Sequence, residues 1–227
     1  MRRLPTYALS AALAAALSLA WAGAAGAQVA RAQHVQPGSP DPWAVLQGVR
    51  QSLVSAGPTG ADFSQVYVPA GFTSGETETG GLSLNLPDCL RWDYQNPYPK
   101  TFLLCGGMVY FWNAEDKTGR RYAVNRQTEP GLDLLLLGVE DLKGRYRASG
   151  RVLPGGRVEV SLVPKEGRPR SEALADASFV VDPGTQRLVQ VAYHDREGNL
   201  TRFAINSYHG LPRSGQFSPP SGIRWEE

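Results

Sequence analysis

Short segments in which apolar and polar residues alternate are the feature that most constrains the fold of this chain. Leu82, Leu84 and Leu86 alternate with Ser83 and Asn85. The same period of two recurs over residues 89–94, 102–104, 157–162, 189–193 and 202–205. Successive side chains of a strand point to opposite faces of its sheet. The pattern therefore predicts antiparallel strands with one buried face and one solvated face.

Two segments depart from this period. Asp41-Pro42 is a typical helix start, apolar residues then recur at helical spacing to about Ala56, and Gly57-Pro58 ends the helix. The Leu-rich segment 129–138 begins with Glu-Pro and is interpreted as a second, short helix. A helix, many strands, an inserted helix and more strands predict an α+β fold, in which a helix lies across the open face of a curved antiparallel sheet.

The N-terminus is typical of a secretory signal peptide over residues 1–27. Arg2 and Arg3 precede an apolar run, and Ala25-Gly26-Ala27 fits a cleavage site. A retained anchor helix is the alternative, but the apolar run is short for a membrane span of about 20 residues. We expect residues 28–42 to form a flexible lead-in and residues 43–227 to form one domain.

Charge argues against nucleic acid as a partner. The whole chain has 23 basic and 21 acidic residues, and the signal segment holds two of the arginines and no acid. The mature chain is therefore neutral, whereas nucleic-acid binding depends on neutralising phosphates.

The two cysteines predict one disulfide. An even number of cysteines in an exported protein favours a bridge, and two free buried thiols are the alternative. With a turn centred on Pro97, Cys89 and Cys105 fall directly opposite each other on neighbouring strands. Both then lie on the face opposite Leu90 and Trp92.

The sequence contains few residues in patterns typical of catalysis. The three histidines lack metal-ligand spacing, and no G-x-S-x-G elbow is present. His194 beside Asp195 could form a base and its orienting partner, but the surrounding turn residues favour two polar residues at a hairpin end. We therefore expect no enzymatic activity, no cofactor and no metal.

The unusual feature is apolar. Residues 108–112 are hydrophobic on both faces of a strand, and 134–137 is a run of four leucines. One interpretation is a well-filled core, and the other is a concave apolar surface that binds a ligand beneath a helix.

The segments 86–97 and 104–113 resemble the LolA family of periplasmic outer-membrane lipoprotein carriers. The matching positions, in order and without a gap, are Pro87, Leu90, Trp92, Pro97, Gly106, Tyr110 and Trp112. Phe63-Ser64-Gln65 is similar to the family's first strand. Pro130 with Leu134 is similar to its Leu-rich lid helix, and 217–223 to its closing Phe-x-x-x-Pro-x-Gly segment.

The resemblance implies an incomplete antiparallel β-barrel of about eleven strands with a helical lid over an apolar cavity. It implies a monomeric periplasmic chaperone that takes lipoprotein acyl chains from a LolCDE-like inner-membrane transporter and passes them to a LolB-like receptor at the outer membrane. The alternative is a binding module of the same fold that senses or scaffolds envelope lipids or lipoproteins without shuttling. LolB-like receptors are themselves lipoproteins, and no cysteine lies near the cleavage site here.

The residues expected to bind lipid share the inward face of the strands: Leu82, Leu84, Leu86, Leu90, Trp92, Tyr94, Phe102, Leu104, Val158, Val160, Leu162, Val189, Val191, Phe203 and Ile205. The residues expected in the lid are Leu132, Leu134, Leu135 and Leu136.

Two positions depart from the family pattern. Many carriers of this family have an inward Arg just before the proline, which bonds the lid and holds the cavity shut, and Leu86 stands there in this chain. Cys105 replaces the Asp of the Asp-Gly turn. We expect a purely apolar contact of Leu86 with Leu134 or Leu135 to replace the latch.

Overall fold

The computed structural model describes residues 38–124, 138–166, 174–212 and 215–226. In chain order their elements are α1 (Pro42–Ala56), β1 (Thr59–Val68), β2 (Glu76–Asn85), β3 (Cys89–Asn96), β4 (Lys100–Cys105), β5 (Met108–Asn113), β6 (Thr118–Ala123), α2 (Val139–Arg145), β7 (Tyr146–Val152), β8 (Val158–Pro164), β9 (Leu174–Asp182), β10 (Arg187–Asp195), β11 (Leu200–Gly210) and β12 (Arg224–Glu226).

Helix α1 begins and ends where its sequence signals predict. The Asp41 side chain accepts hydrogen bonds from the backbone N–H groups of Trp43 and Ala44, at 2.9 and 3.4 Å. Gly57 ends the helix with a φ of 71°. Glycine suits this position because it has no Cβ and adopts a positive φ readily. Neither described helix is long and apolar enough to cross a membrane.

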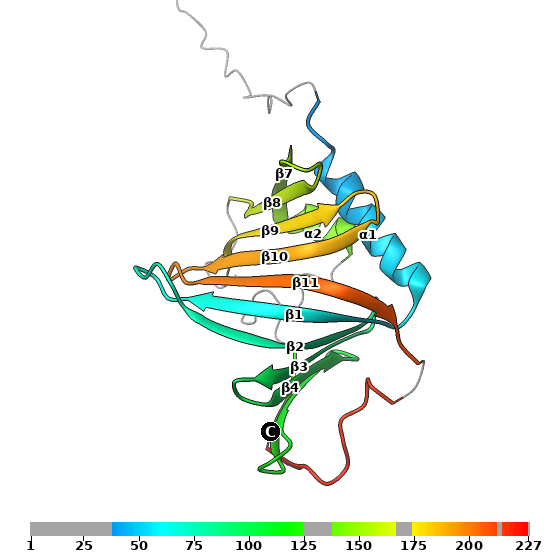
Figure 1. The fold of residues 1–227 in the computed structure, drawn as a ribbon, viewed down its shortest axis with the longest axis vertical. Coiled ribbons are helices and arrows are strands. Elements are labelled where there is room, and N and C mark those ends of the chain that lie inside the picture. Colours follow the sequence, from blue (N-terminus) through cyan, green and yellow to red (C-terminus); the bar gives the residue numbers. More distant parts are fainter. Residues whose placement is uncertain (1–37, 125–137, 167–173, 213–214, 227) are drawn as a thin grey trace, which may run out of the picture. The chain divides into compact units, whose positions relative to one another are not determined.

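The described strands form one open, curved sheet, as predicted. Its order is β12-β6-β5-β4-β3-β2-β1-β11-β10-β9-β8-β7 (Figure 1). Every neighbouring pair is antiparallel except β12, which pairs with β6 in parallel. The described sheet has twelve strands, one more than the eleven that the family resemblance implies, and the alternation of residue types does not by itself indicate β6, β7, β9 or β12.

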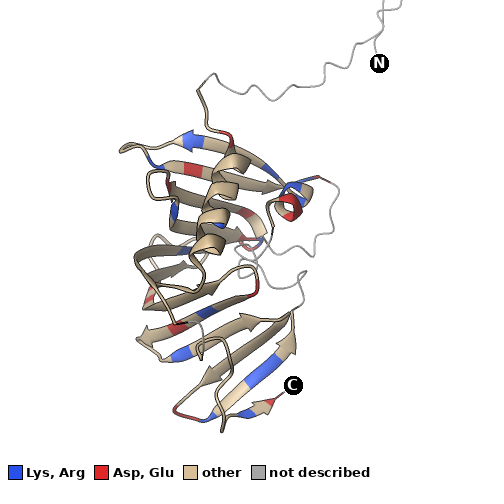
Figure 2. Cartoon of the chain, turned by 90° about the vertical axis from the view of Figure 1, so that its right-hand side faces the viewer, with Lys and Arg blue, Asp and Glu red and all other residues tan. Residues whose placement is uncertain are grey.

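One face of this sheet, here called the inner face, carries the hydrophobic core. Helix α1 packs on it against β7, β8, β10 and β2, and α2 packs against α1 and β7. Figure 2 shows α1 lying across the strands at one end of the sheet, with almost no charge along its length. The inner face is therefore covered by a described helix mainly at the β7–β10 end.

The opposite, outer face of β3 to β6 is covered by the C-terminal segment 215–226. Arg91 donates a 2.9 Å hydrogen bond to the backbone oxygen of Gln216. Further along, Trp225 in β12 makes edge-on contacts with Tyr110 and Trp112, with centroids 5.6 and 6.1 Å apart. Leu103 is fully buried on this face, so this end of the sheet has a second, smaller apolar layer.

The second helix predicted over 129–138 lies outside the described residues, except for Gly138. That glycine is the N-cap of α2, which spans only Val139–Arg145. The prediction of a Leu-rich helix is therefore not tested.

Candidate functional site

The inner face is the candidate site, and its centre is built by β2 and β3. Leu82, Leu84 and Leu86 are 2, 3 and 8% exposed. Across the strands, Leu84 pairs with Leu90 and Leu82 pairs with Trp92. Directly opposed side chains on one face of an antiparallel pair contact each other, so the alternation in the sequence becomes a continuous apolar surface.

An aromatic row, with rings from five strands, continues this surface from β11 to β5. Its successive members are Phe203 on β11, Phe63 on β1, Tyr94 on β3, Phe102 on β4 and Phe111 on β5. Their neighbouring ring centroids lie 5.9, 5.0, 5.9 and 4.5 Å apart. Such aromatic contacts are worth about 0.5–1.5 kcal/mol each beyond their area. The row joins the two halves of the sheet.

At the other end of the sheet, the predicted residues of β8, β10 and β11 complete the same cluster. Those that belong to its buried part are Val158, Val160, Leu162, Val191 and Ile205. Helix α1 covers them with Leu46, Val49 and Leu53. All of these contacts are between hydrocarbon groups, which have no directional preference.

Val189, also expected on the inward face, is half-buried and lies outside the buried cluster. The pairing of β10 with β9 shifts between Leu188 and Gln190, which is a β-bulge. Leu188 is 2% exposed and belongs to the cluster, whereas Val189 is half-buried and does not. One extra residue in a strand changes which side chains face inward, so strict alternation fails there.

The remaining predicted residues lie on the same face. Phe102 and Phe203 are partly buried against the cluster, and Leu104, which is 4% exposed, pairs with Leu90. The predicted lid residues lie outside the described residues: Leu132, Leu134, Leu135 and Leu136. The expected contact of Leu86 with Leu134 or Leu135 therefore stays a prediction.

The few polar groups of the inner face remain uncharged or paired. Tyr94 donates a 2.5 Å hydrogen bond to Oε1 of Gln65. Burial, and secondarily the nearby Glu78 carboxylate, raise the pKa of Tyr94 well above its ordinary value. Glu78 is itself paired with Lys100 at 2.6 Å. Burial also raises the pKa of Tyr193, so both phenols stay neutral at physiological pH.

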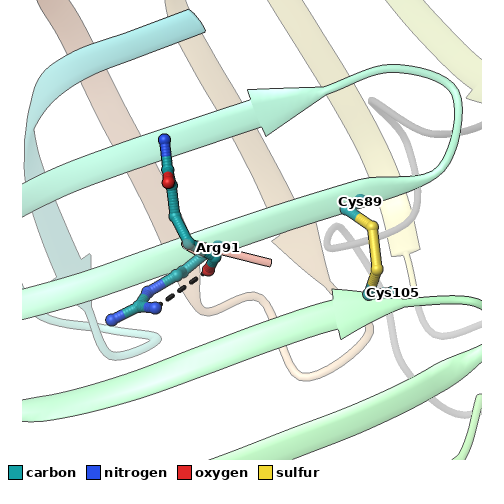
Figure 3. Close-up of a disulfide and its surroundings, with 4 residues drawn as sticks. Cys89, Arg91 and Cys105 are labelled. Atoms are coloured by element: carbon teal, nitrogen blue, oxygen red, sulfur yellow. Dashed lines mark hydrogen bonds between the residues drawn. A yellow bond between two sulfur atoms is a disulfide. The ribbon is translucent and has the colours of Figure 1, made fainter. Parts of the chain in front are cut away.

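The predicted disulfide is present and spans β3 and β4. Cys89 and Cys105 pair directly, with Cα atoms 4.2 Å apart. Figure 3 shows Arg91 two residues along β3, on the same side as the bridge. Its guanidinium pairs with Asp93 at 2.7 Å and lies 5.4 Å from the ring centroid of Trp112. The bridge therefore belongs to the outer layer and leaves the inner face free of sulfur.

Several residues of the cluster were missed from the sequence. Phe179 and Val181 come from β9, where Val180 interrupts the alternation. Phe111 faces inward, but both faces of β5 are apolar, so the alternation of residue types does not distinguish its inner face from its outer face. The register separates them, because Phe111 opposes Phe102 while Trp112 opposes Thr101.

The one histidine considered for chemistry lies among ordinary surface contacts. His194 Nδ1 is 2.9 Å from a carboxylate oxygen of Asp176, and both side chains are over 40% exposed. Asp195 instead accepts hydrogen bonds from Asn199 in the following turn. Within the described ranges, no group of three or more His, Cys, Asp or Glu residues could hold a metal ion.

The architecture is that of an incomplete antiparallel barrel, in which a helix covers part of the apolar inner face of an open, curved sheet. Residues 57–218 match the family described as outer membrane lipoprotein carrier protein LolA. The chain belongs to the LolA family, as the sequence resemblance indicated, and this family consists of carriers and not of enzymes.

Individual relatives agree with this assignment. An outer-membrane lipoprotein carrier protein of Methylococcus capsulatus is 29% identical over 77% of this chain and 84% of its own length. One from Xanthomonas axonopodis is 26% identical over 78% of this chain and 87% of its own length. A solved structure of an uncharacterised conserved protein from Thermus thermophilus shares the fold, with a TM-score of 0.51, 10% identity, and coverage of 81% of this chain and 96% of that one.

Proposed function

We propose that this protein is a periplasmic carrier that binds the acyl chains of lipoproteins released from the inner membrane and delivers them to the outer membrane. The observation that carries the proposal is the continuous apolar inner face, from Leu82 on β2 to Val160 on β8, in a chain of the LolA family. The signal-like N-terminus fits export to the periplasm.

The physical need for such a face follows from the hydrophobic effect. Each acyl methylene left in water costs about 0.8 kcal/mol, so a long chain cannot cross an aqueous compartment uncovered. The inner face offers the hydrocarbon surface that would replace water around the chain. Its neutral tyrosines, Tyr94 and Tyr193, do not impose a charge on that environment.

Release is as necessary as binding, and α1 suggests how both occur. The helix covers the inner face through Leu46, Val49 and Leu53. An acyl chain that displaces these side chains exchanges one hydrocarbon contact for another at little net cost. The helix and the chain would therefore compete for one surface, and the carrier would hold its cargo without trapping it.

Two partners follow from this proposal. A LolCDE-like transporter would load the carrier at the inner membrane, and a LolB-like receptor would accept the cargo at the outer membrane. Leu86 is 8% exposed and belongs to the apolar cluster, where many carriers of the family have an Arg latch. Opening would then require no broken latch hydrogen bond at this position.

The first test is release of lipoprotein from inner-membrane vesicles that contain the transporter. Purified mature protein should move labelled lipoprotein into the soluble fraction, and vesicles without it should retain their label. A protein that binds lipoprotein but leaves it in the membrane would instead be a sensor or scaffold.

The second test locates the cargo. The photo-reactive residue p-benzoylphenylalanine would replace Phe102, which is partly buried on the inner face, or Phe72, which is 70% exposed in the β1–β2 loop. We expect crosslinks to lipoprotein acyl chains from position 102 and none from position 72. Equal crosslinking from both positions would rule out the inner face as the binding surface.

A further inference from the structure

Strands β10 and β11 separate at one end, which leaves a split in the sheet. They pair only from Gln190 opposite Ala204 to His194 opposite Leu200. Beyond Gln190, β10 pairs only with β9, and beyond Ala204, β11 pairs only with β1. Figure 1 shows the two strands diverging toward this end.

Irregular backbone flanks the split on both sides. The bulge at Val189 lies on one side, and the register of β1 with β11 shifts between Gly60 and Asp62 on the other. Ser207 has a φ of 53°, which a non-glycine residue rarely adopts. The Tyr208 hydroxyl crosses the split and donates a 2.7 Å hydrogen bond to the backbone oxygen of Leu188.

A pocket of about 420 Å³ lies at this split, within the usual size range for small-molecule sites. Its lining combines apolar side chains with polar ones: Val189, Ile205, Tyr208, Arg157, Asp182, Thr185, Arg187, Asn206 and Ser207. Ile205 also belongs to the buried cluster of the inner face, so the pocket reaches the apolar core.

The rim of this pocket is cationic. Register places Asp182 opposite Arg187, and Val181 opposite Val158, the residue that follows Arg157. Asp182 uses its Oδ1 atom to accept from the backbone of Gly184 and Thr185, at 2.9 and 3.3 Å. Neither arginine forms an ion pair with a carboxylate of the described residues, and Arg187 lies 5.1 Å from the ring centroid of Tyr208.

We propose that this split is a second lipid site, which binds an amphiphile with an anionic head, either a carboxylate or a phosphate. The guanidinium groups of Arg157 and Arg187 would bind the head at the rim of the pocket, because guanidinium forms charge-assisted hydrogen bonds with both kinds of anion. The alkyl chain would enter between β10 and β11 toward Val189 and Ile205. The site differs from the inner face in requiring a charged head.

The need for an anionic head is tested with cis-parinaric acid, a fluorescent fatty acid, and its uncharged methyl ester. The affinities of the protein for the two compounds are compared. We expect the mature protein to bind the acid about tenfold more tightly, as for a gained charge-assisted interaction. The variant Arg157→Gln/Arg187→Gln should bind acid and ester equally. Arg202→Gln, which changes an exposed arginine of β11 outside the pocket, should keep the full preference.

Competition distinguishes the two sources of the anionic head. If dihexanoyl phosphatidic acid displaces the fluorescent acid and dihexanoyl phosphatidylcholine does not, the site binds a phosphate head. Displacement by dodecanoate alone identifies a carboxylate. Equal binding of acid and ester to the parent protein, or an unchanged preference in the double variant, overturns the proposal.

The same variants separate this site from lipoprotein carriage. The double variant should still release lipoprotein from inner-membrane vesicles, because neither arginine belongs to the apolar cluster of the inner face. Loss of lipoprotein release together with loss of the acid preference would show one shared site and overturn the proposal of a second one.

Discussion

The rings of Phe63 and Tyr94 meet edge-on at 5.0 Å, although their strands are separated by β2. The residue between them in the register is Gly80, which opposes Phe63 on one side and Tyr94 on the other. Because Gly80 has no side chain, the two rings contact each other across it. The aromatic row of the inner face therefore depends on one glycine.

Gly80→Ala should destabilise the protein strongly. A Cβ at this position would lie 2.0 Å from the backbone oxygen of Asp93, so β2 and β3 would have to separate. We expect a loss of more than about 2 kcal/mol in the free energy of unfolding, in the range of other core overpacking changes. Denaturant unfolding followed by tryptophan fluorescence measures it.

The adjacent Gly81 is the matched control for this change. A Cβ there meets nothing within 4 Å, and its φ is not in the left-handed region. Gly81→Ala should therefore be neutral or stabilise by up to about 1 kcal/mol, through the unfolded chain. Equal effects of the two substitutions would contradict the role given to Gly80.

The disulfide should contribute stability without taking part in binding. Cys89 and Cys105 close a loop with a sequence separation of 16, for which chain entropy predicts about 3 kcal/mol. Cys89→Ser/Cys105→Ser should lose about that amount in urea unfolding while it still releases lipoprotein. Dithiothreitol should lower the stability of the parent protein and leave the double variant unchanged.

Stability should fall at alkaline pH. Burial raises the pKa of Tyr94 and Tyr193, so between pH about 10 and the raised values the unfolded chain loses phenolic protons that the folded chain keeps. The unfolded state then binds fewer protons, and the free energy of unfolding decreases as pH rises above about 10, while it is insensitive to these groups below that pH.

Unfolding measured from pH 8 to 12 tests this dependence. Tyr94→Phe should make the alkaline decline shallower, whereas Tyr98→Phe, at a side chain that is 72% exposed, should leave it unchanged. The slopes are compared rather than the absolute stabilities, because Tyr94→Phe also removes the hydrogen bond to Gln65. Identical slopes for the parent and Tyr94→Phe would contradict the assignment.

Leu86→Arg tests the missing latch. Leu86 is 8% exposed in the apolar cluster, and a guanidinium buried at this position would need hydrogen-bond acceptors that the hydrocarbon side chains around it do not offer. We expect several-fold slower release of lipoprotein from inner-membrane vesicles. Leu86→Met, which conserves volume and polarity, should behave like the parent. If Leu86→Arg releases lipoprotein normally, the apolar contact at this position does not matter.

The sequence by itself determined the features whose causes are local. Asp41 and Gly57 fix the ends of α1 through backbone groups within a few residues. The turn centred on Pro97 sets the β3–β4 register and hence the opposition of Cys89 and Cys105. Alternation identified the inner face of β2 and β3, because a strand has a side-chain period of two.

Only the tertiary structure decided the features that depend on distant partners. At the bulge on Val189, β10 has one residue more than β9, so that Leu188 joins the cluster in place of Val189. The register of β5 with β4 determines which face of β5 points inward. Trp225 contacts Trp112 only because β12 pairs with β6, which lies next to β5. The contact of Phe63 with Tyr94 across Gly80 needs three strands in register, and no local pattern encodes that.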